Sequence, residues 1–254
     1  MNARRISTLL VSCAVASSLA ACANGHPAAA KKGLNKPTGP SSTRSTGSGL
    51  PAGMTTLPPS RPDSVRTSDM VVRLSDLPAG WSPMKNSTSP AQQLAQDSFF
   101  DHCLGIPVIE GVTTKIAYSQ FKDHGGVAFV YSSAAAFKKA VDAEAEGAAL
   151  RGAKVVSCNI ATERKYTAAP PGGKVGAITG KVLPLPRGEF GDRIVTQLTL
   201  KNGVKFLYYA DQIGIVAGRF VVQLEFDSAV SPPNGALEAK VAKAVFLRSL
   251  AAAV

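Results

Sequence analysis

The sequence contains few of the residue types on which metal, cofactor and redox sites depend. Its 254 residues include three histidines, four cysteines and one tryptophan. None of the histidines, which are His26, His102 and His124, has a further ligand at the spacing of a metal site. No Cys-x-x-Cys motif is present either. We therefore predict a protein without a metal site, a cofactor or a dithiol active site.

The motifs of nucleophilic and phosphate chemistry are absent or incomplete. No Gly-x-Ser-x-Gly motif occurs. Ser119 and Lys122 match a Ser-x-x-Lys motif, but the apolar pattern around them predicts a strand rather than the start of a helix. The segment 176–181 is similar to a phosphate-binding loop, yet it is one residue short, and Val182 replaces the residue that would bind magnesium. No catalytic residue is assigned.

Four carboxylates on neighbouring predicted strands leave two interpretations open. These residues are Asp192, Asp211, Glu225 and Asp227. A glycosidase would need two of them to line a cleft, with at least one buried so that its pKa is shifted. The alternation of apolar residues over 220–226 places Glu225 on the polar face of its strand. A solvated face is therefore favoured, and an envelope hydrolase remains an alternative.

The charge of the chain gives no sign of nucleic-acid binding. The formal net charge is +11, but the basic residues of the C-terminal part occur singly, and no arginine-rich stripe alternates with aromatic residues. Nucleic acid is therefore excluded as a predicted partner.

The N-terminus has the pattern of an export signal. Arg4 and Arg5 precede an uncharged apolar segment, 6–21, which is short for a membrane span. Leu19-Ala20-Ala21-Cys22 ends this segment and resembles the lipobox of bacterial lipoproteins. The resemblance implies that Cys22 receives a lipid, becomes the mature N-terminus and anchors the protein to the outer face of the cell membrane. An ordinary cleaved signal peptide and a transmembrane anchor are the alternatives.

Composition divides the chain into three parts. The signal peptide covers 1–21, and the segment 22–65 comprises Cys22 and a tether rich in Gly, Pro, Ser and Thr without an apolar period. Such a composition buries too little apolar surface to offset the entropy of ordering, so we expect the tether to be disordered. The remaining residues, 66–254, form one predicted domain.

The cysteines have separate predicted roles. Cys13 lies in the signal peptide and Cys22 is the lipid site. This leaves Cys103 and Cys158 as a pair in an oxidising compartment, where a structural disulfide is favoured over a redox pair.

Apolar periodicity predicts an α+β domain. Helices are expected over 89–103 and 133–150 and from 231 onward, with strands elsewhere, including 154–160 around Cys158. Asn202-Gly203 between two apolar runs predicts a hairpin. The sum is an antiparallel β-sheet meander with helices packed on one face.

The domain resembles the extracytoplasmic sensor-like domains of high-GC Gram-positive bacteria, which occur as lipoproteins and as the outer domains of receptor kinases. The resemblance rests on 74–81, on Cys103 with Cys158, on 191–193 and on the turn 218–219. It implies an antiparallel sheet with a cleft, and a role in binding a small-molecule, lipid or protein ligand.

Three functions are therefore considered. The first is a non-enzymatic, membrane-anchored binding domain. The second is a carrier that holds a hydrophobic envelope lipid in a cleft between helix and sheet, and the third is the hydrolase.

Trp81, the single tryptophan, is expected to anchor the core, with a place in a ligand cleft beside Phe99 and Phe100 as the alternative.

Overall fold

The computed structural model describes residues 61–85, 89–106, 117–185, 189–229 and 231–253. The predicted signal peptide, Cys22 and the tether up to residue 60 lie outside the described residues. The first described helix, α2 (Asp63–Met70), begins shortly before the predicted start of the domain at residue 66. Among the described helices, none is long and apolar enough to cross a membrane.

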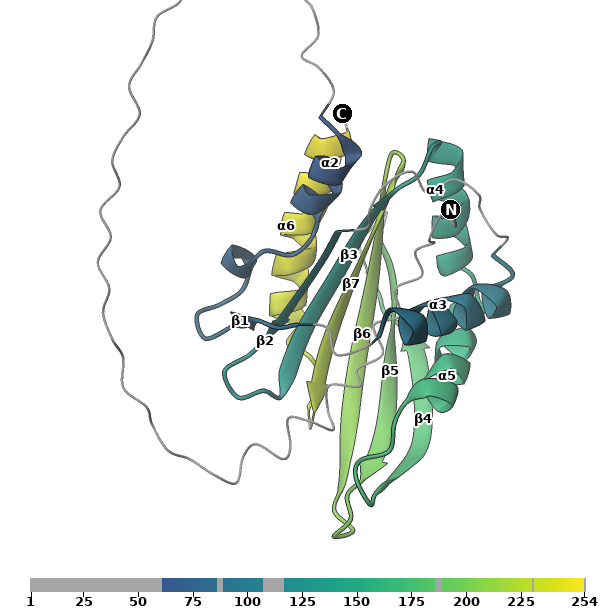
Figure 1. Ribbon diagram of the computed structural model, residues 1–254, viewed down its shortest axis with the longest axis vertical. Helices are drawn as coiled ribbons and strands as arrows, with labels where there is room; N and C mark the ends of the chain where they lie inside the picture. Colours follow the sequence, from purple (N-terminus) through teal and green to yellow (C-terminus); the bar gives the residue numbers. More distant parts are fainter. Residues whose placement is uncertain (1–60, 86–88, 107–116, 186–188, 230, 254) are drawn as a thin grey trace, which may run out of the picture.

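The described strands form one antiparallel sheet of seven strands, in the order β1-β2-β3-β7-β6-β5-β4 (Figure 1). Strands β4 to β7 are consecutive neighbours and form the predicted meander, while β3 pairs with β7 and so joins the N-terminal strands to the last one. The strands are β1 (Ser82–Pro83), β2 (Ala117–Lys122), β3 (Ala128–Ala136), β4 (Lys174–Val182), β5 (Glu189–Thr199), β6 (Lys205–Ala217) and β7 (Phe220–Ala229).

The predicted hairpin at Asn202-Gly203 joins β5 to β6. Gly203 has a φ of 83°, a left-handed conformation that glycine adopts at little cost. The Val204 amide donates to the Asn202 side chain at 3.1 Å, and the Leu200 amide donates to the Val204 carbonyl at 2.8 Å. The turn therefore fixes the register of the two longest strands of the sheet.

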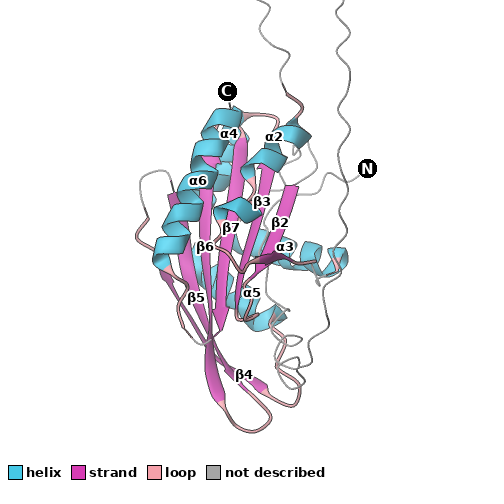
Figure 2. Ribbon diagram, turned by 90° about the vertical axis from the view of Figure 1, so that its left-hand side faces the viewer, coloured by secondary structure: helices cyan, strands magenta, loops and turns pink. Residues whose placement is uncertain are grey.

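Helices cover both faces of the sheet (Figures 1 and 2). Helix α2, the short 3₁₀ helix η2 (Leu74–Asp76) and α6 (Gly235–Ala253) lie on one face. Helices α3 (Pro90–Leu104), α4 (Ala140–Leu150) and α5 (Val155–Tyr166) lie on the other. The predicted fold class, an antiparallel sheet with helices in one α+β domain, is confirmed. The arrangement differs from the expected one in that the helices form two layers instead of one.

Strand β7 shows why two helical layers form. Its alternate residues Phe220, Val222, Leu224 and Phe226 are buried against α6, as the alternation predicted. The intervening Val221 is equally buried, and it packs with Phe137 and Ala143 of the opposite layer. Both sides of this central strand are therefore removed from water, so each side needs a cover.

The segment predicted as a strand over 154–160 is the helix α5, so that prediction was wrong. The β-branched residues Val155, Val156 and Ile160 favoured a strand. The buried positions nevertheless recur at the spacing of a helix, at Val155, Cys158, Asn159, Thr162 and Glu163. Three of these five residues are polar, so the apolar pattern alone did not reveal the helical period.

The helix predicted over 133–150 begins later than expected. Residues up to Ala136 belong to β3, and α4 starts at Ala140. The alanines 134–136 favour a helix by propensity, but they pair with β7 from Val222 to Phe220. Tertiary pairing in the middle of the sheet therefore outweighs local propensity at this point.

Helix α2 is attached to the C-terminal end of α6. The Arg66 guanidinium donates to the Ala252 carbonyl, and Arg219 forms an ion pair with Asp63. Lower down, Arg248 of α6 donates to Asp76 at 2.9 and 2.7 Å and to the Val71 carbonyl at 3.0 Å. Burial would raise the pKa of Asp76, but the bonds from Arg248 and the Arg73 amide outweigh burial and lower it.

Candidate functional site

A row of polar side chains crosses the sheet on the face that α3, α4 and α5 cover. Asp192 of β5 pairs with Gln212 of β6, Gln212 pairs with Glu225 of β7, and Glu225 pairs with Tyr131 of β3. Residues that pair directly in a sheet project to the same side. The register therefore brings two carboxylates, an amide and a phenol side by side beneath the helices.

These side chains line a small cavity, which we call the central cavity. Its walls also include Phe100 from α3, Leu150 from α4, Val155 from α5 and Phe190 from β5. Its volume is about 30 Å³, which is room for one or two water molecules. The central cavity is lined by Phe100, Tyr131, Ser133, Leu150, Val155, Phe190, Gly191, Asp192, Gln212, Ile213, Gly214, Gln223, Leu224 and Glu225.

Asn159 of α5 joins the helical layer to the polar row. Its Nδ2 donates to both carboxylate oxygens of Asp192, at 3.1 and 2.9 Å, and to Oε1 of Gln212 at 3.1 Å. Asn159 is fully buried and sits on the inner side of the helix that the sequence pattern missed. Its role was therefore not predicted, although the spacing of Val155, Asn159 and Thr162 carried the signal.

Burial raises the pKa of two carboxyls on this face, Asp192 and Glu163, to about 7. The pKa of Asp192 is raised from 3.8 to about 7, mainly by burial and also by the charges of Asp211 and Glu163, although the hydrogen bond from Asn159 acts to lower it. Burial likewise raises the pKa of Glu163 from 4.5 to about 7, although the Thr167 hydroxyl donates to it. Near neutral pH each carboxyl is therefore divided between its charged and uncharged forms.

Glu225 and Asp227 form a closely coupled pair on β7. Burial raises the pKa of Glu225 well above its ordinary value, and the neighbouring charge of Asp227 adds to this effect. Asp227 accepts a hydrogen bond from the Tyr208 hydroxyl at 2.5 Å. A side-chain hydrogen bond with Asp227 also raises the pKa of Glu225, so the surroundings of Glu225 favour its protonated form.

The prediction of a solvated face for Glu225 was wrong. Its side chain lies opposite Phe226, as the alternation indicated, but Glu225 is only 5% exposed and Asp192 only 2%. The helices α3, α4 and α5 cover this face, and the alternation of residues within the strand does not indicate that a helical layer lies over it. Asp211 is on the other face, where it forms an ion pair with Arg193, so the four carboxylates do not form one site.

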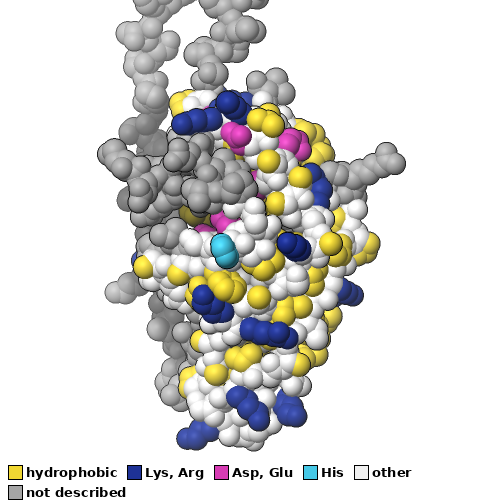
Figure 3. Space-filling view, turned by 90° about the vertical axis from the view of Figure 1, so that its right-hand side faces the viewer, with side chains coloured by type: hydrophobic (Ala, Val, Ile, Leu, Met, Phe, Trp, Pro, Cys, Tyr) yellow, Lys and Arg dark blue, Asp and Glu magenta, His cyan; other side chains and the backbone are white. Residues whose placement is uncertain are grey.

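Figure 3 shows the outer surface of this helical layer. Lys and Arg side chains are spread over it, among hydrophobic ones, while Asp and Glu side chains are few. The acidic residues of this layer lie mainly inside, where Asp97, Asp101, Glu146 and Glu163 are buried.

A second and larger hollow lies on the opposite face, beside α6. This α6 groove has a volume of about 620 Å³, within the range of small-molecule sites. Its lining is mainly apolar, with Glu189, Glu238 and Lys243 as the charged members. Figure 2 shows this face, with α6 lying along the sheet. The groove is lined by Leu183, Pro184, Leu185, Glu189, Ile213, Gly235, Glu238, Ala239, Ala242, Lys243 and Phe246.

Glu238 is the main polar group of the α6 groove. The pKa of Glu238 is raised from 4.5 to about 7, mainly by burial and also by the charge of Asp211, although the charge of Arg193 acts to lower it. Its Oε1 has no hydrogen-bond partner among the described residues. The groove therefore combines an apolar lining with one buried carboxyl that is partly protonated near neutral pH.

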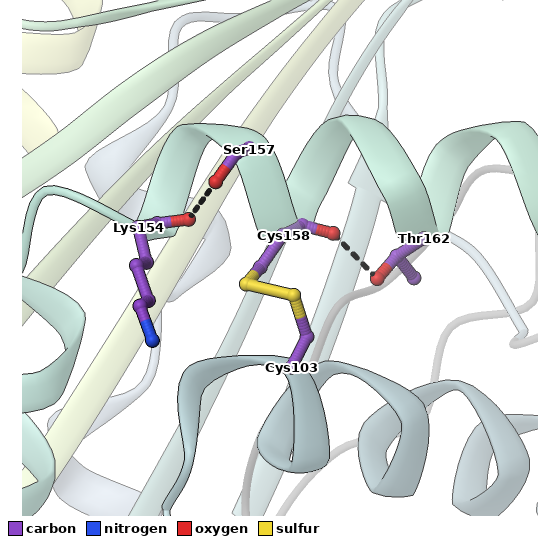
Figure 4. Close-up of a disulfide and its surroundings, with 5 residues drawn as sticks. All are labelled: Cys103, Lys154, Ser157, Cys158 and Thr162. Carbon is purple, nitrogen blue, oxygen red and sulfur yellow. Dashed lines mark hydrogen bonds between the residues drawn. A yellow bond between two sulfur atoms is a disulfide. The ribbon is translucent and has the colours of Figure 1, made fainter.

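The predicted disulfide between Cys103 and Cys158 is present, with the Cα atoms 5.7 Å apart (Figure 4). It joins the end of α3 to the first turn of α5. In Figure 4, Cys158 and Thr162 occupy successive turns of α5, where the Thr162 hydroxyl donates to the Cys158 carbonyl. The disulfide therefore holds the helix that carries Phe100 against the one that carries Asn159.

The remaining candidate residues have structural positions. Trp81 packs against the main core beneath α6, as expected, while Phe100 lines the central cavity and Phe99 contacts the Tyr166 ring. His102 and His124 are exposed. Among the described residues, no group of His, Cys, Asp and Glu is arranged to hold a metal ion.

The motif matches that were set aside lie in strands, as predicted. Ser119 is on β2, with its hydroxyl 2.6 Å from that of Ser132, and 176–181 belongs to β4. Cys22 lies outside the described residues.

No protein-family model and no curated protein matches the chain. Among solved structures, the fold is similar to the crystal structure of the extracellular domain of PknH from Mycobacterium tuberculosis. The two share 17% sequence identity and a TM-score of 0.41, and the similarity covers 71% of this chain and 95% of that one. A similarity of this size carries no conclusion about ligand or activity.

Proposed function

We propose that the chain is a membrane-anchored surface lipoprotein whose domain binds a ligand of the cell envelope without catalysing a reaction. The observation that carries the proposal is the α6 groove, because it is the larger of the two hollows described above and has a mainly apolar lining. The lipobox at Cys22 supports a place on the outer face of the cell membrane.

The lining of the α6 groove indicates the chemistry of its ligand. Leu185, Ile213 and Phe246 present aliphatic and aromatic surface, so an aliphatic chain would be removed from water there. Glu238 would meet a polar end of the ligand, and Lys243 would meet an anionic one. A small lipid or lipid-like molecule fits this combination.

The same groove favours a second candidate function, which is the carriage of a hydrophobic envelope lipid. A carrier differs from a sensor in that its ligand leaves one membrane and reaches another. Transfer of a labelled lipid between two vesicle populations, faster with the protein than without it, would separate the carrier from a domain that only binds.

The hydrolase alternative is less favoured by the geometry. Ser133, Asp192 and Glu225 do line one cavity, and both carboxyls have a raised pKa. The cavity nevertheless has room for only one or two water molecules. A sugar ring or a peptide bond does not fit between the described side chains. We therefore propose that the domain binds its ligand without hydrolysing it.

Filling the α6 groove is expected to weaken ligand binding. Ala239 lines the groove with its own side chain exposed, so Ala239→Trp would occupy the groove without disturbing the core. We expect at least about a tenfold loss of affinity for a fluorescent fatty acid, measured by titration, because the indole would take the place of the chain.

The matched control for this variant is Ala251→Trp, on an exposed position of the same helix away from the groove. It should bind like the unmodified chain. Equal affinity in all three proteins, or no binding by the unmodified chain, would show that the groove is not a ligand site.

The lipid anchor has its own test. Cys22→Ser should abolish incorporation of radiolabelled palmitate and release the protein from the membrane fraction, because only a thiol at the lipobox accepts the lipid. Cys13→Ser, within the same signal segment, should leave both unchanged. Labelling that persists without Cys22 would contradict the anchor.

A further inference from the structure

The α6 groove follows one side of a single helix. Its lining on α6 extends from Gly235 to Phe246, which corresponds to a length of about 16 Å along the helix axis. Leu185 of the β4–β5 connection and Ile213 of β6 belong to the same lining. A volume of about 620 Å³ along such a length suits one extended alkyl chain better than a compact ring.

Glu238 lies within the length of the groove. It follows Gly235 by one turn of α6, and Ala242 and Phe246 continue the lining on the next two turns. Its side chain is already only 8% exposed in the free groove. A chain that fills the groove from end to end would therefore pass over the Glu238 carboxyl and exclude the remaining water from it.

The surroundings of Glu238 are balanced in charge when this carboxyl is protonated. Asp211 has Arg193 as its ion-pair partner, and none of the ion pairs within the described ranges includes Glu238. A hydrogen bond links the carboxyls of Glu238 and Asp211, and such a bond needs one proton. The group of three side chains therefore has no net charge with Glu238 protonated and one negative charge with Glu238 ionised.

Other charged groups face Glu238 from the sheet and from α6. Alternate residues of β5 and β6 project toward α6, and Lys181 of β4 pairs with Arg193. Lys243 is the cation of the groove lining, but its side chain is exposed, so it stays in water when the groove is filled. The charged and titratable groups on this side are Lys181, Glu189, Arg193, Tyr209, Asp211 and Lys243.

We propose that the α6 groove binds the alkyl chain of a single-chain lipid over the protonated form of Glu238, so that lipid binding takes up a proton. The inference rests on the proposed function, because it concerns the ligand of the same groove. An alkyl chain has no polar group to compensate an ionised carboxyl, and it displaces the water that does so in the free groove. The protonated carboxyl, which donates to Asp211, does not carry this cost.

Lipid affinity should fall as the pH rises through 7. The pKa of Glu238 is about 7 in the free groove, mainly because of burial. A chain over the carboxyl removes more water from it and raises the pKa further. The lipid therefore binds the protonated form, which predominates below about pH 6 and is nearly lost above about pH 8.

The test uses the purified protein and 1-decanol, a probe that does not itself ionise in this pH range. Isothermal titration calorimetry should show an affinity at pH 8.5 that is at least about tenfold lower than at pH 6. At pH 7, binding should take up about half a proton per decanol, measured from the heats in buffers of different ionisation enthalpy. Circular dichroism at each pH shows whether the protein is folded.

The decisive variant is Glu238→Gln, which keeps the shape of the side chain and has no charge at either pH. It should bind decanol as tightly at pH 8.5 as the unmodified protein does at pH 6, with no uptake of protons. Because this variant is expected to gain affinity at pH 8.5, a folding defect would not produce the same result.

Two further variants complete the experiment. Glu144→Gln, on an exposed position of α4 on the opposite face of the sheet, is the matched control and should keep the full pH dependence. Ala239→Trp, which fills the groove, should lose decanol binding at both pH values and so place the probe in the groove.

The possible failures are distinguishable. Equal affinity of the unmodified protein at pH 6 and pH 8.5 would overturn the inference and leave the groove as a lipid site. A pH dependence that persists in Glu238→Gln would overturn it by assigning the proton to another group. Absence of decanol binding at both pH values would overturn the proposed function together with the inference.

Discussion

The domain is expected to unfold at a lower temperature at pH 8 than at pH 5. Asp192 has a pKa of about 7 in the folded state against 3.8 ordinarily, and Glu163 and Glu238 reach about 7 from 4.5. Between about pH 4 and pH 7 the folded state therefore holds protons that the unfolded state has released. Stability is greatest at the acid end of this window and is lost as the pH rises through about 7.

The expected magnitude follows from the shift of a single group. With a folded-state pKa of about 7 and an ordinary pKa of 3.8, Asp192 alone lowers the free energy of unfolding by ~3 kcal/mol between pH 5 and pH 8. For a domain of this size we expect the Tm to fall by about 8 °C or more between pH 5 and pH 8. Below about pH 4 the trend reverses, because the pKa of Asp76 is lowered and its contacts with Arg248 are lost on protonation.

Thermal unfolding followed by circular dichroism at several pH values measures this effect. Asp192→Asn removes the charge and keeps the shape, so its Tm at pH 8 should be higher than that of the unmodified chain and should depend less on pH. Exposed Glu144→Gln should leave the pH profile unchanged. A Tm that stays constant or rises between pH 5 and pH 8 would show that these carboxyls are not held protonated in the fold.

Removal of the disulfide is expected to have an effect of similar size. Cys103 and Cys158 close a loop with a sequence separation of 55 residues. Restriction of the unfolded chain by such a loop contributes ~4 kcal/mol. The double variant Cys103→Ala, Cys158→Ala should lose about that much in the free energy of unfolding, measured by urea denaturation.

Loss of the disulfide should also loosen one wall of the central cavity, because Phe100 lies on the helix that the disulfide holds. Ser157→Ala, an exposed neighbour of Cys158, is the control and should change stability by less than about 0.5 kcal/mol. A double variant as stable as the unmodified chain would show that α3 is held by its packing alone.

The sheet was predictable because its signals are local. The alternation of β7 placed Phe220 and Phe226 on one side, Asn202-Gly203 specified a hairpin, and the two cysteines of the predicted domain had one another as partners. Each of these inferences depends on residues that are near in sequence or on simple pairing. These predictions therefore needed no knowledge of how the elements pack in the folded domain.

The site was not predictable, because it depends on which surfaces meet. Glu225 was placed on the correct side of its strand, but its burial depends on three helices that come from elsewhere in the chain. Asn159 was assigned to a strand, because the inner side of α5 is polar where it meets the carboxylates. The α6 groove depends on where the β4–β5 connection runs past α6, which no short pattern encodes.

The attachment of α2 to the end of α6 brings the two ends of the described chain together at one end of the domain. The chain enters the fold at Asp63 and completes α6 at Ala253, and Figure 1 shows both at one end of the molecule, with the hairpin between β5 and β6 at the far end. Under the proposed anchor at Cys22, the tether would enter the domain at this end, and the hairpin would be the part of the domain farthest from the point of attachment. A protein fused behind α6 would then lie next to the tether, whereas one inserted at Lys201 and Asn202 would lie at the opposite end of the domain.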